Sequence, residues 1–263
     1  MKKISKIALA TIITSTISAN AGVILDAEVG AGVWNSSPSG TIHYGDNGSN
    51  IDLENDLGLE SNSNTYLYAY FEHFIPLIPN ARVEQQKLKI SGTSKPITSL
   101  TFNGNKYETK INTDLDLTQN DFTVYWGIPG INLFTAGILD VNFGINLKQF
   151  QGHIQLDETL TDTSDKVDLD FFVPMGYLAA VVDVPILPIK FNANYKTISY
   201  KDSALRDIMA KVSLELPLPI PLIDFSIDVG YKKQTLSISK DLSDNLNTDI
   251  KFEGPFVGLN AKF

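Results

Sequence analysis

The chain contains no cysteine, only 3 histidines and fewer basic than acidic residues. Without cysteine it can form no disulfide framework, no thiolate-ligated zinc site and no thiol catalytic centre. Its 21 lysine and arginine residues against 30 aspartate and glutamate residues give a formal charge of -9. A nucleic-acid-binding protein needs a basic surface, so this balance predicts no nucleic-acid partner.

Long hydrophobic runs are also missing. No stretch comes near the roughly 20 consecutive apolar residues that a membrane-spanning helix requires, which excludes a helical membrane protein. Hydrophobic residues still make up 43% of the chain, so global disorder is excluded as well.

The first residues have the composition of a secretion signal. Three lysines form a basic start, residues 7–17 are mostly apolar, and small residues lead up to Ala21. This order is typical of a segment that a signal peptidase removes. We therefore predict a cleaved signal peptide over residues 1–21 and a single domain over residues 22–263.

Beyond this segment, apolar and polar residues alternate with a period of two. Residues 25–33 read LDAEVGAGV, and residues 139–148 read LDVNFGINLK. Such alternation is typical of β-strands with one apolar and one polar face. It fits a membrane barrel, with apolar residues toward lipid and polar residues toward the lumen, and it also fits a soluble β-sandwich.

The connections between the strands favour the barrel. Short proline-rich segments alternate along the chain with long polar segments. An outer-membrane barrel has this arrangement, with short periplasmic turns and long external loops. The short segments are residues 75–80, 128–130, 185–188 and 217–222, and the long ones are residues 35–64, 91–113, 151–168, 201–203 and 239–248.

We predict an all-β fold, a single antiparallel up-and-down transmembrane β-barrel of about ten strands, with eight or twelve as alternatives. Twelve would result if Asn103-Gly104, a hairpin signal in a long segment, joined two further membrane strands. The alternation changes parity between Leu117 and Phe122, which predicts a β-bulge. The ten predicted strands are residues 23–34, 65–73, 81–91, 114–127, 133–150, 169–183, 189–200, 204–216, 223–238 and 249–263.

The end of the chain carries a predicted insertion signal. Val257, Leu259, Ala261 and Phe263 share one face of the last strand, and the final residue is aromatic. We interpret this pattern as the one that the barrel-assembly machinery recognises, which makes that machinery a predicted partner. Aromatic residues such as Tyr66 lie toward the ends of other predicted strands, where membrane barrels have aromatic belts.

Charged residues of both signs fall on the predicted lumen faces. A charge inside a narrow barrel must be paired or hydrated. The set therefore predicts either a plug of salt bridges and hydrogen bonds or a narrow pore, and we favour the plug because ten strands leave little room beyond their own side chains. The predicted lumen residues are Asp26, Glu28, Glu72, Arg82, Glu84, Asp140, Asn142, Lys148, Lys190, Lys196, Lys211, Glu215, Asp224, Asp228 and Lys232.

Several motifs resemble those of a known group of proteins. They are GAGVW at 30–34 with PSG at 38–40, DL at 52–53 with DLGL at 56–59, EHFIPLIPNAR at 72–82, a D..L.D...KVS block at 202–213, and GP..GL...F at 254–263. With these motifs the chain resembles an uncharacterised family of Gram-negative outer-membrane β-barrel proteins over nearly all of residues 22–263. The family has proline where this chain has Phe74. The resemblance implies an outer-membrane barrel and brings no catalytic residues.

Few residues suggest chemistry. His153, near Asp157 and Glu158 at a predicted outer rim, is the candidate for a rim hydrolase, but the spacing matches no catalytic motif, so we expect no enzyme. The first long segment is acidic, yet it lacks the glycine-containing twelve-residue loop of a calcium site, so we expect no metal and no cofactor. The candidate calcium ligands there are Asp52, Glu54 and Asp56.

Together these features predict a cell outer-membrane barrel of structural, surface-interaction or narrow-channel type, with an interior largely plugged by charged and polar side chains. The alternatives are a passive cation-preferring pore for small solutes and, less favoured, a rim hydrolase. Expected partners are outer-membrane lipid and lipopolysaccharide, whose phosphates acidic loops can bridge through divalent cations. We expect a monomer.

Overall fold

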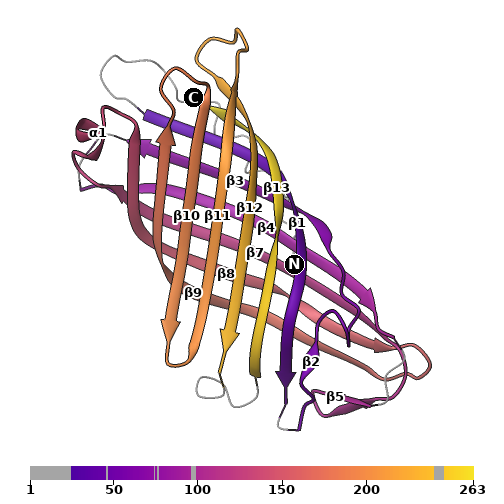
Figure 1. Cartoon of the computed structure of the whole chain (residues 1–263). Helices are drawn as coiled ribbons and strands as arrows, with labels where there is room; N and C mark the ends of the chain where they lie inside the picture. The colour runs from indigo at the N-terminus through magenta and orange to yellow at the C-terminus, as the bar shows by residue number, and fades with distance from the viewer. Residues whose placement is uncertain (1–24, 46, 74, 76, 96–98, 240–245) are drawn as a thin grey trace, which may run out of the picture.

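The computed structural model describes residues 25–263 except 46, 74, 76, 96–98 and 240–245. Ten long strands pair antiparallel in chain order, and β13 pairs back with β1, so the sheet closes into a barrel (Figure 1). The predicted signal peptide lies outside the described residues. The barrel strands are β1 (Leu25–Tyr44), β3 (Asn62–His73), β4 (Asn80–Thr93), β7 (Ile111–Gly127), β8 (Leu139–Glu158), β9 (Ser164–Asp183), β10 (Ile189–Tyr200), β11 (Ser203–Leu216), β12 (Asp224–Ile238) and β13 (Leu246–Lys262).

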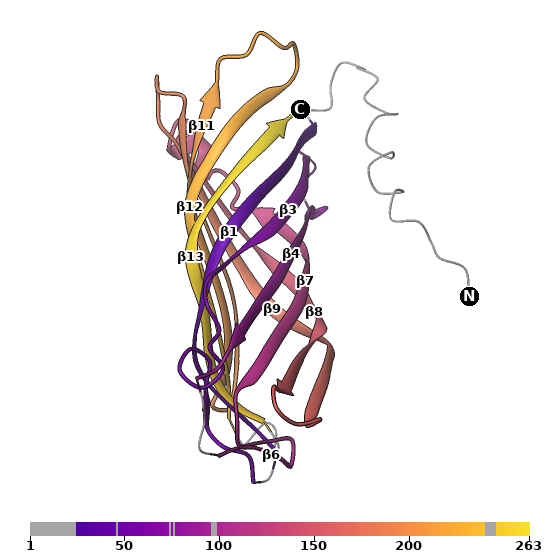
Figure 2. The ribbon, with the colours of Figure 1, turned by 90° about the vertical axis from the view of Figure 1, so that its right-hand side faces the viewer.

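The two ends of the barrel differ. At one end, which we call the turn end, the Phe263 amide donates a hydrogen bond to the Ala27 carbonyl at 2.8 Å, so the first and last strands meet there. The short proline-rich segments connect strands at this end, which is uppermost in Figure 1. There, the connection predicted as residues 128–130 extends over residues 128–138. The opposite end, the loop end, carries the two longest connections, residues 45–61 and 94–110, but also the shortest, residues 201–202 (Figure 2). Its short elements are β2 (Ile51–Asp52), which pairs with β1, and the hairpin of β5 (Leu100–Phe102) and β6 (Asn105–Tyr107).

The predicted ten-stranded antiparallel barrel is confirmed. The predicted hairpin at Asn103-Gly104 also forms, with φ angles of 49° and 84° at its two central residues. Positive φ at both positions is the geometry of the tight hairpin turns that suit the twist of β-strands. Because this hairpin is a separate two-stranded sheet, the alternative of twelve barrel strands is wrong.

Several predicted boundaries are also wrong. Residues 131–134 form the single-turn helix α1 (Ile131–Phe134), so the strand predicted from residue 133 begins at Leu139. The predicted loop over residues 151–168 is mostly strand, because β8 continues to Glu158 and β9 begins at Ser164. At the loop end, these strands therefore continue well beyond the boundaries predicted from the alternation of apolar and polar residues.

The predicted bulge is absent. The change of parity that suggested it arises because the interior of the barrel changes from polar to apolar along this strand. The pairing of β7 with β4 and β8 runs without interruption from Leu117 to Phe122. Phe122 faces outward and is 48% exposed, whereas Leu117 faces inward and is 7% exposed. The strand keeps its register while its apolar side chains move from the outer face to the inner face.

Toward the loop end, the interior is an apolar core. Side chains of the long strands pack there with residues of β2, the following loop and the β5–β6 hairpin, which fold inward. This part of the barrel has the pattern of a soluble protein, with apolar residues inside and polar residues outside. We call the following buried set the loop-end core: Ile51, Leu53, Leu57, Leu59, Leu88, Ile90, Leu100, Phe102, Tyr107, Ile111, Leu115, Leu117, Phe150, Ile154, Leu156, Leu205 and Phe252.

Toward the turn end, the pattern is reversed and the outer face is apolar. Among the described residues, no helix is long and apolar enough to cross a membrane. The exposed apolar side chains instead form a band around the strands. We call this set the apolar band: Val33, Leu67, Phe71, Val83, Phe122, Val124, Phe143, Ile145, Leu147, Phe172, Leu178, Phe191, Ile208, Val212, Leu214, Val229, Val257 and Leu259.

Candidate functional site

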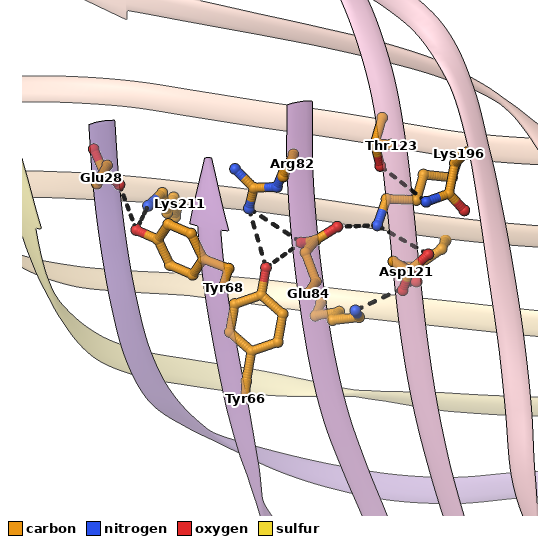
Figure 3. A network of polar contacts seen from close by, with 12 residues as sticks. Glu28, Tyr66, Tyr68, Arg82, Glu84, Asp121, Thr123, Lys196 and Lys211 are labelled. Atoms are coloured by element: carbon orange, nitrogen blue, oxygen red, sulfur yellow. Dashed lines mark hydrogen bonds and ion pairs between the residues drawn. The ribbon is translucent and has the colours of Figure 1, made fainter. Parts of the chain in front are cut away.

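Ten charged side chains converge inside the barrel at the level of the apolar band, and Figure 3 shows part of them. Five are acidic and five are basic, so the set is formally neutral. They come from seven strands spread around the barrel wall. We call this set the charged network: Glu28, Arg82, Glu84, Asp121, Lys148, Lys196, Asp207, Lys211, Asp228 and Lys232.

Lys148 lies at the centre of one half of the charged network. Its Nζ is 2.6 Å from a carboxylate oxygen of Asp121 and 3.1 Å from one of Asp207, and its side chain is 0% exposed. Asp207 also receives Lys232 Nζ at 3.3 Å. A buried charge is tolerated only when such partners replace water, and Lys148 has two.

Glu84 connects this half to a tyrosine and an arginine. Its carboxylate accepts hydrogen bonds from the Tyr66 hydroxyl, from Lys196 and, at 3.1 Å, from Arg82 (Figure 3). Lys196 in turn lies 3.2 Å from Asp121, which links the two clusters. The Glu84 carboxylate is therefore surrounded by donors on strands from both sides of the barrel.

Tyr68 connects the remaining members. Its hydroxyl donates to Glu28 at 2.5 Å and accepts from Lys211 at 3.0 Å. Lys211 also lies 2.7 Å from Asp228, which accepts a further hydrogen bond from Ser213 at 2.6 Å. Every ionised group in this cluster has a partner of opposite charge or a hydroxyl.

A pair of amides crosses the bore beside the charged network. Gln119 Nε2 donates to Gln234 Oε1 at 2.9 Å, and Gln234 Nε2 donates to Gln119 Oε1 at 2.8 Å. These residues lie on β7 and β12, which are five strands apart in a ring of ten and so on opposite walls. Side chains therefore bridge the full width of the barrel at this level.

The structure places eight of the predicted lumen residues in the charged network. Two further members, Asp121 and Asp207, are not among the predicted lumen residues. The change of parity between Leu117 and Phe122 makes the inward direction of Asp121 impossible to assign from alternation alone. Asp207 does alternate with the outward residues Ile208 and Val212, so that period of two was a usable signal. Tyr66, assigned to an aromatic belt, lies inside and is 2% exposed.

Other predicted lumen residues lie near the turn end and are less enclosed. Lys190 Nζ is 2.8 Å from Glu215 and 3.6 Å from Asp183, with side chains 31–42% exposed. Asp26 pairs with Lys262 at 2.6 Å where the first and last strands meet. Such partly exposed pairs contribute little to stability, because water screens them.

The last group has few polar contacts. Glu72 accepts a hydrogen bond from the Tyr125 hydroxyl at 2.7 Å. Apart from the backbone pairing of β8, the side chains of Asp140 and Asn142 form no hydrogen bond or ion pair with another described residue. Asp224 is exposed at the first position of β12. Among the described residues, the most deeply buried ion pairs are thus confined to the level of the charged network.

The candidate hydrolase residues do not come together. His153 faces outward on β8, where the strand register places it between Asp116 and Asp168. Glu158 faces the interior, on the opposite side of the barrel wall. A nucleophile, a base and an orienting group must lie within hydrogen-bond reach, and this predicted set does not.

The candidate calcium residues stabilise a turn. The Asp52 carboxylate accepts hydrogen bonds from the amides of Glu54 and Asn55 at 3.0 and 2.8 Å. The Asp56 carboxylate accepts one from the Asp52 amide at 2.8 Å. Within the part of the chain that the structure describes, no group of three or more potential ligands is arranged to hold a metal ion.

At the loop end, the Glu158 side chain links β8 to two neighbouring connections. Its carboxylate accepts hydrogen bonds from the Thr161 hydroxyl and from the amides of Glu108 and Thr109, the latter two at 2.6 and 2.7 Å. The hydrogen bond from Thr161 and those from the two amides lower the pKa of Glu158 to about 2. The charged form thus holds the segment that follows the β5–β6 hairpin.

We expect this attachment to be lost in acid. Because the pKa is lowered in the folded state, its stabilising effect is complete above the unfolded value of about 4.3 and disappears as the pH falls toward about 2. Hydrogen exchange of the Glu108 and Thr109 amides should show strong protection at pH 5 and weak protection at pH 2. Glu158→Gln should weaken protection at pH 5, whereas the exposed Glu60→Gln should not. Protection independent of both pH and Glu158→Gln would contradict this assignment.

Comparison with known proteins adds little to this geometry. No protein-family model and no curated protein sequence matches the chain. Among solved structures, the translocator domain of the autotransporter NalP from Neisseria meningitidis matches with a TM-score of 0.40 and 10% identity over 90% of this chain and 87% of that one. The attachment invasion locus protein Ail of Yersinia pestis matches with a TM-score of 0.34 and 12% identity over 91% and 99% of the two chains. Neisserial surface protein A matches with a TM-score of 0.31 and 10% identity over 92% and 99%. At such scores the strand pairing itself remains the evidence for the fold.

Proposed function

We propose that this protein is an outer-membrane barrel with a closed bore, which presents a polar surface and its loop end outside the cell. The apolar band is what lipid requires of a barrel wall, since lipid-facing and lumen-facing residues alternate along each membrane strand. The two longest connections lie at the loop end, which supports an orientation with the turn end in the periplasm.

The filled interior is the observation that best supports a closed bore. The charged network joins strands from different sides of the barrel at the level of the apolar band, and the Gln119–Gln234 bridge crosses the bore at the loop-end edge of that band. Closer to the loop end, the loop-end core fills the interior with apolar side chains. Two successive barriers of different chemistry favour a closed barrel over the alternative of a cation-preferring pore.

The outward face beyond the apolar band supports the surface role. On β4, β7 and β8, the strand register aligns Gln85, Asn120 and Gln149 in one row, with side-chain hydrogen bonds of 2.9 and 3.5 Å. This row marks the change from the apolar band to a polar wall. Two rows further toward the loop end lie Lys89, Asp116, His153 and Asp168. A rigid wall with both charges and amides fits polar partners such as lipopolysaccharide head groups.

The closed bore predicts no steady conductance from the refolded protein in planar bilayers, because buried side chains cross the interior at two levels. A porin refolded in the same lipid is the positive control, and heat-modifiable migration in a gel shows that the barrel has folded. Reproducible cation-selective steps from folded protein would contradict the closed bore and establish the pore instead.

A further inference from the structure

The turn end has an apolar surface that extends beyond the strands. The side chains of Leu77, Phe134, Ile186 and Leu222 are 92, 92, 103 and 91% exposed. They lie in four different connections between strands. None of these connections, residues 75–79, 127–138, 184–188 and 216–222, contains a charged residue.

Three of these residues also occupy an unfavourable backbone conformation. Leu77, Ile186 and Leu222 have φ angles of 74°, 73° and 66°. Ile186 follows a proline in a turn closed by a 3.2 Å hydrogen bond from the Leu187 amide to the Val184 carbonyl. This position of a type II turn favours glycine or asparagine. A bulky apolar side chain here strains the backbone, and contact with water provides no burial of apolar surface to offset that strain.

The apolar band is too short on one side of the barrel. On β8 the outward apolar residues run from 139 to 147, but on β4 they cover only 81–83 and on β7 only 122–126. Two to four residue steps span about 7–13 Å along a strand at about 3.3 Å each, against the roughly 25 Å of a lipid-facing band. The turns that adjoin these two strands, 75–79 and 127–138, supply the missing apolar surface.

We infer that the exposed apolar side chains of the four turns insert into the acyl chains of the adjacent leaflet, while the polar backbone of the turns stays at the level of the head groups. The inference rests on the proposed position of the barrel in a membrane. Lipid is the occupant because the apolar surface is continuous with the apolar band and occurs in all four connections, none of which contains a charged residue. Lipid contact also accounts for the apolar residues kept at strained positions.

Single labels can test this position, because the chain has no cysteine of its own. We would attach one environment-sensitive fluorophore to Leu77→Cys, Ile186→Cys or Leu222→Cys in nanodiscs, which leave both membrane faces accessible. Ile145→Cys in the apolar band and Leu160→Cys, an 80% exposed leucine at the loop end, are the matched controls. We expect nitroxide-labelled acyl chains to quench the turn-end and Ile145 labels, and aqueous iodide to quench only the Leu160 label.

The outcomes separate the two proposals. Turn-end labels that iodide quenches, beside an Ile145 label that lipid quenches, would overturn the embedded turn end and leave the membrane barrel intact. A protein partner would then be the occupant to test. An Ile145 label that lipid does not quench would overturn the membrane position, and this inference with it.

A second test uses substitutions whose expected effect on stability differs between a turn in lipid and a turn in water. Asparagine fits a positive φ better than leucine or isoleucine does, so Ile186→Asn or Leu222→Asn in a water-exposed turn should leave stability unchanged or raise it. In an embedded turn, the same changes place an amide in hydrocarbon and should lower the urea midpoint for unfolding from lipid vesicles. Leu160→Asn should not change the midpoint. Unchanged or raised midpoints for both turn variants would overturn the inference.

Discussion

Asp207→Ala is expected to destabilise the folded barrel by about 3–5 kcal/mol, the cost of removing one partner from a buried ion pair. Asp207 is the shared acceptor of Lys148 and Lys232, at 3.1 and 3.3 Å, and all three side chains are nearly or fully buried. Without the Asp207 carboxylate, the buried charges of Lys148 and Lys232 each lose a partner of opposite charge, and water does not replace it. The urea midpoint for unfolding from lipid vesicles measures the effect.

Asp224→Asn is the matched control for this change, because Asp224 is an exposed acid on the same lumen-facing parity. Its midpoint should equal that of the unmodified protein. If Asp207→Ala also left the midpoint unchanged, water would have to screen the charges of Lys148 and Lys232. That result would contradict the closed bore and agree with a hydrated pore.

Ile145→Arg is expected to cost about 2–4 kcal/mol, the penalty for arginine on the lipid face near the middle of a membrane. Ile145 lies on the outward face of β8 within the apolar band and is 60% exposed. Gln151→Arg is the control, since it changes the same face of the same strand beyond the apolar band. It should have little effect, because its side chain remains in water.

The difference between these two variants locates the membrane boundary along β8. The same vesicle unfolding titration measures both. Equal destabilisation would show that the apolar band and the polar wall have the same surroundings, and would contradict a bilayer position that ends between Ile145 and Gln151.

The sequence predicts the barrel well along the apolar band. Alternation over residues 139–148 and the proline-rich turns are enough to predict ten strands, and the structure closes those strands into one sheet. The prediction fails where the strands leave the apolar band. There the polar face turns outward, so the polar stretch 151–168 resembles a long loop, although most of it belongs to β8 and β9.

The bulge is the clearest example of this failure. A true bulge and a reversal of surroundings both change the parity of apolar residues in one strand. Only the neighbouring strand can distinguish them, because an unbroken pairing of Val83 with Phe122 and Leu88 with Leu117 leaves no room for an extra residue. Contacts across the bore, such as Gln119 with Gln234, likewise depend on strands distant in the chain and have no local signal.

Contacts between segments that are distant in the chain also constrain the order of folding. Tyr68 contacts Asp228 across 160 positions of the chain, and Trp34 donates a hydrogen bond to the Gly254 carbonyl across 220 positions. An open sheet of the first strands would leave Glu84 without Lys196, and the Tyr68 hydroxyl without Lys211. Bringing distant segments together is slow, since the entropy of closing long loops is lost before the contacts form. Folding should therefore be cooperative, with the interior becoming dry only when β13 pairs with β1.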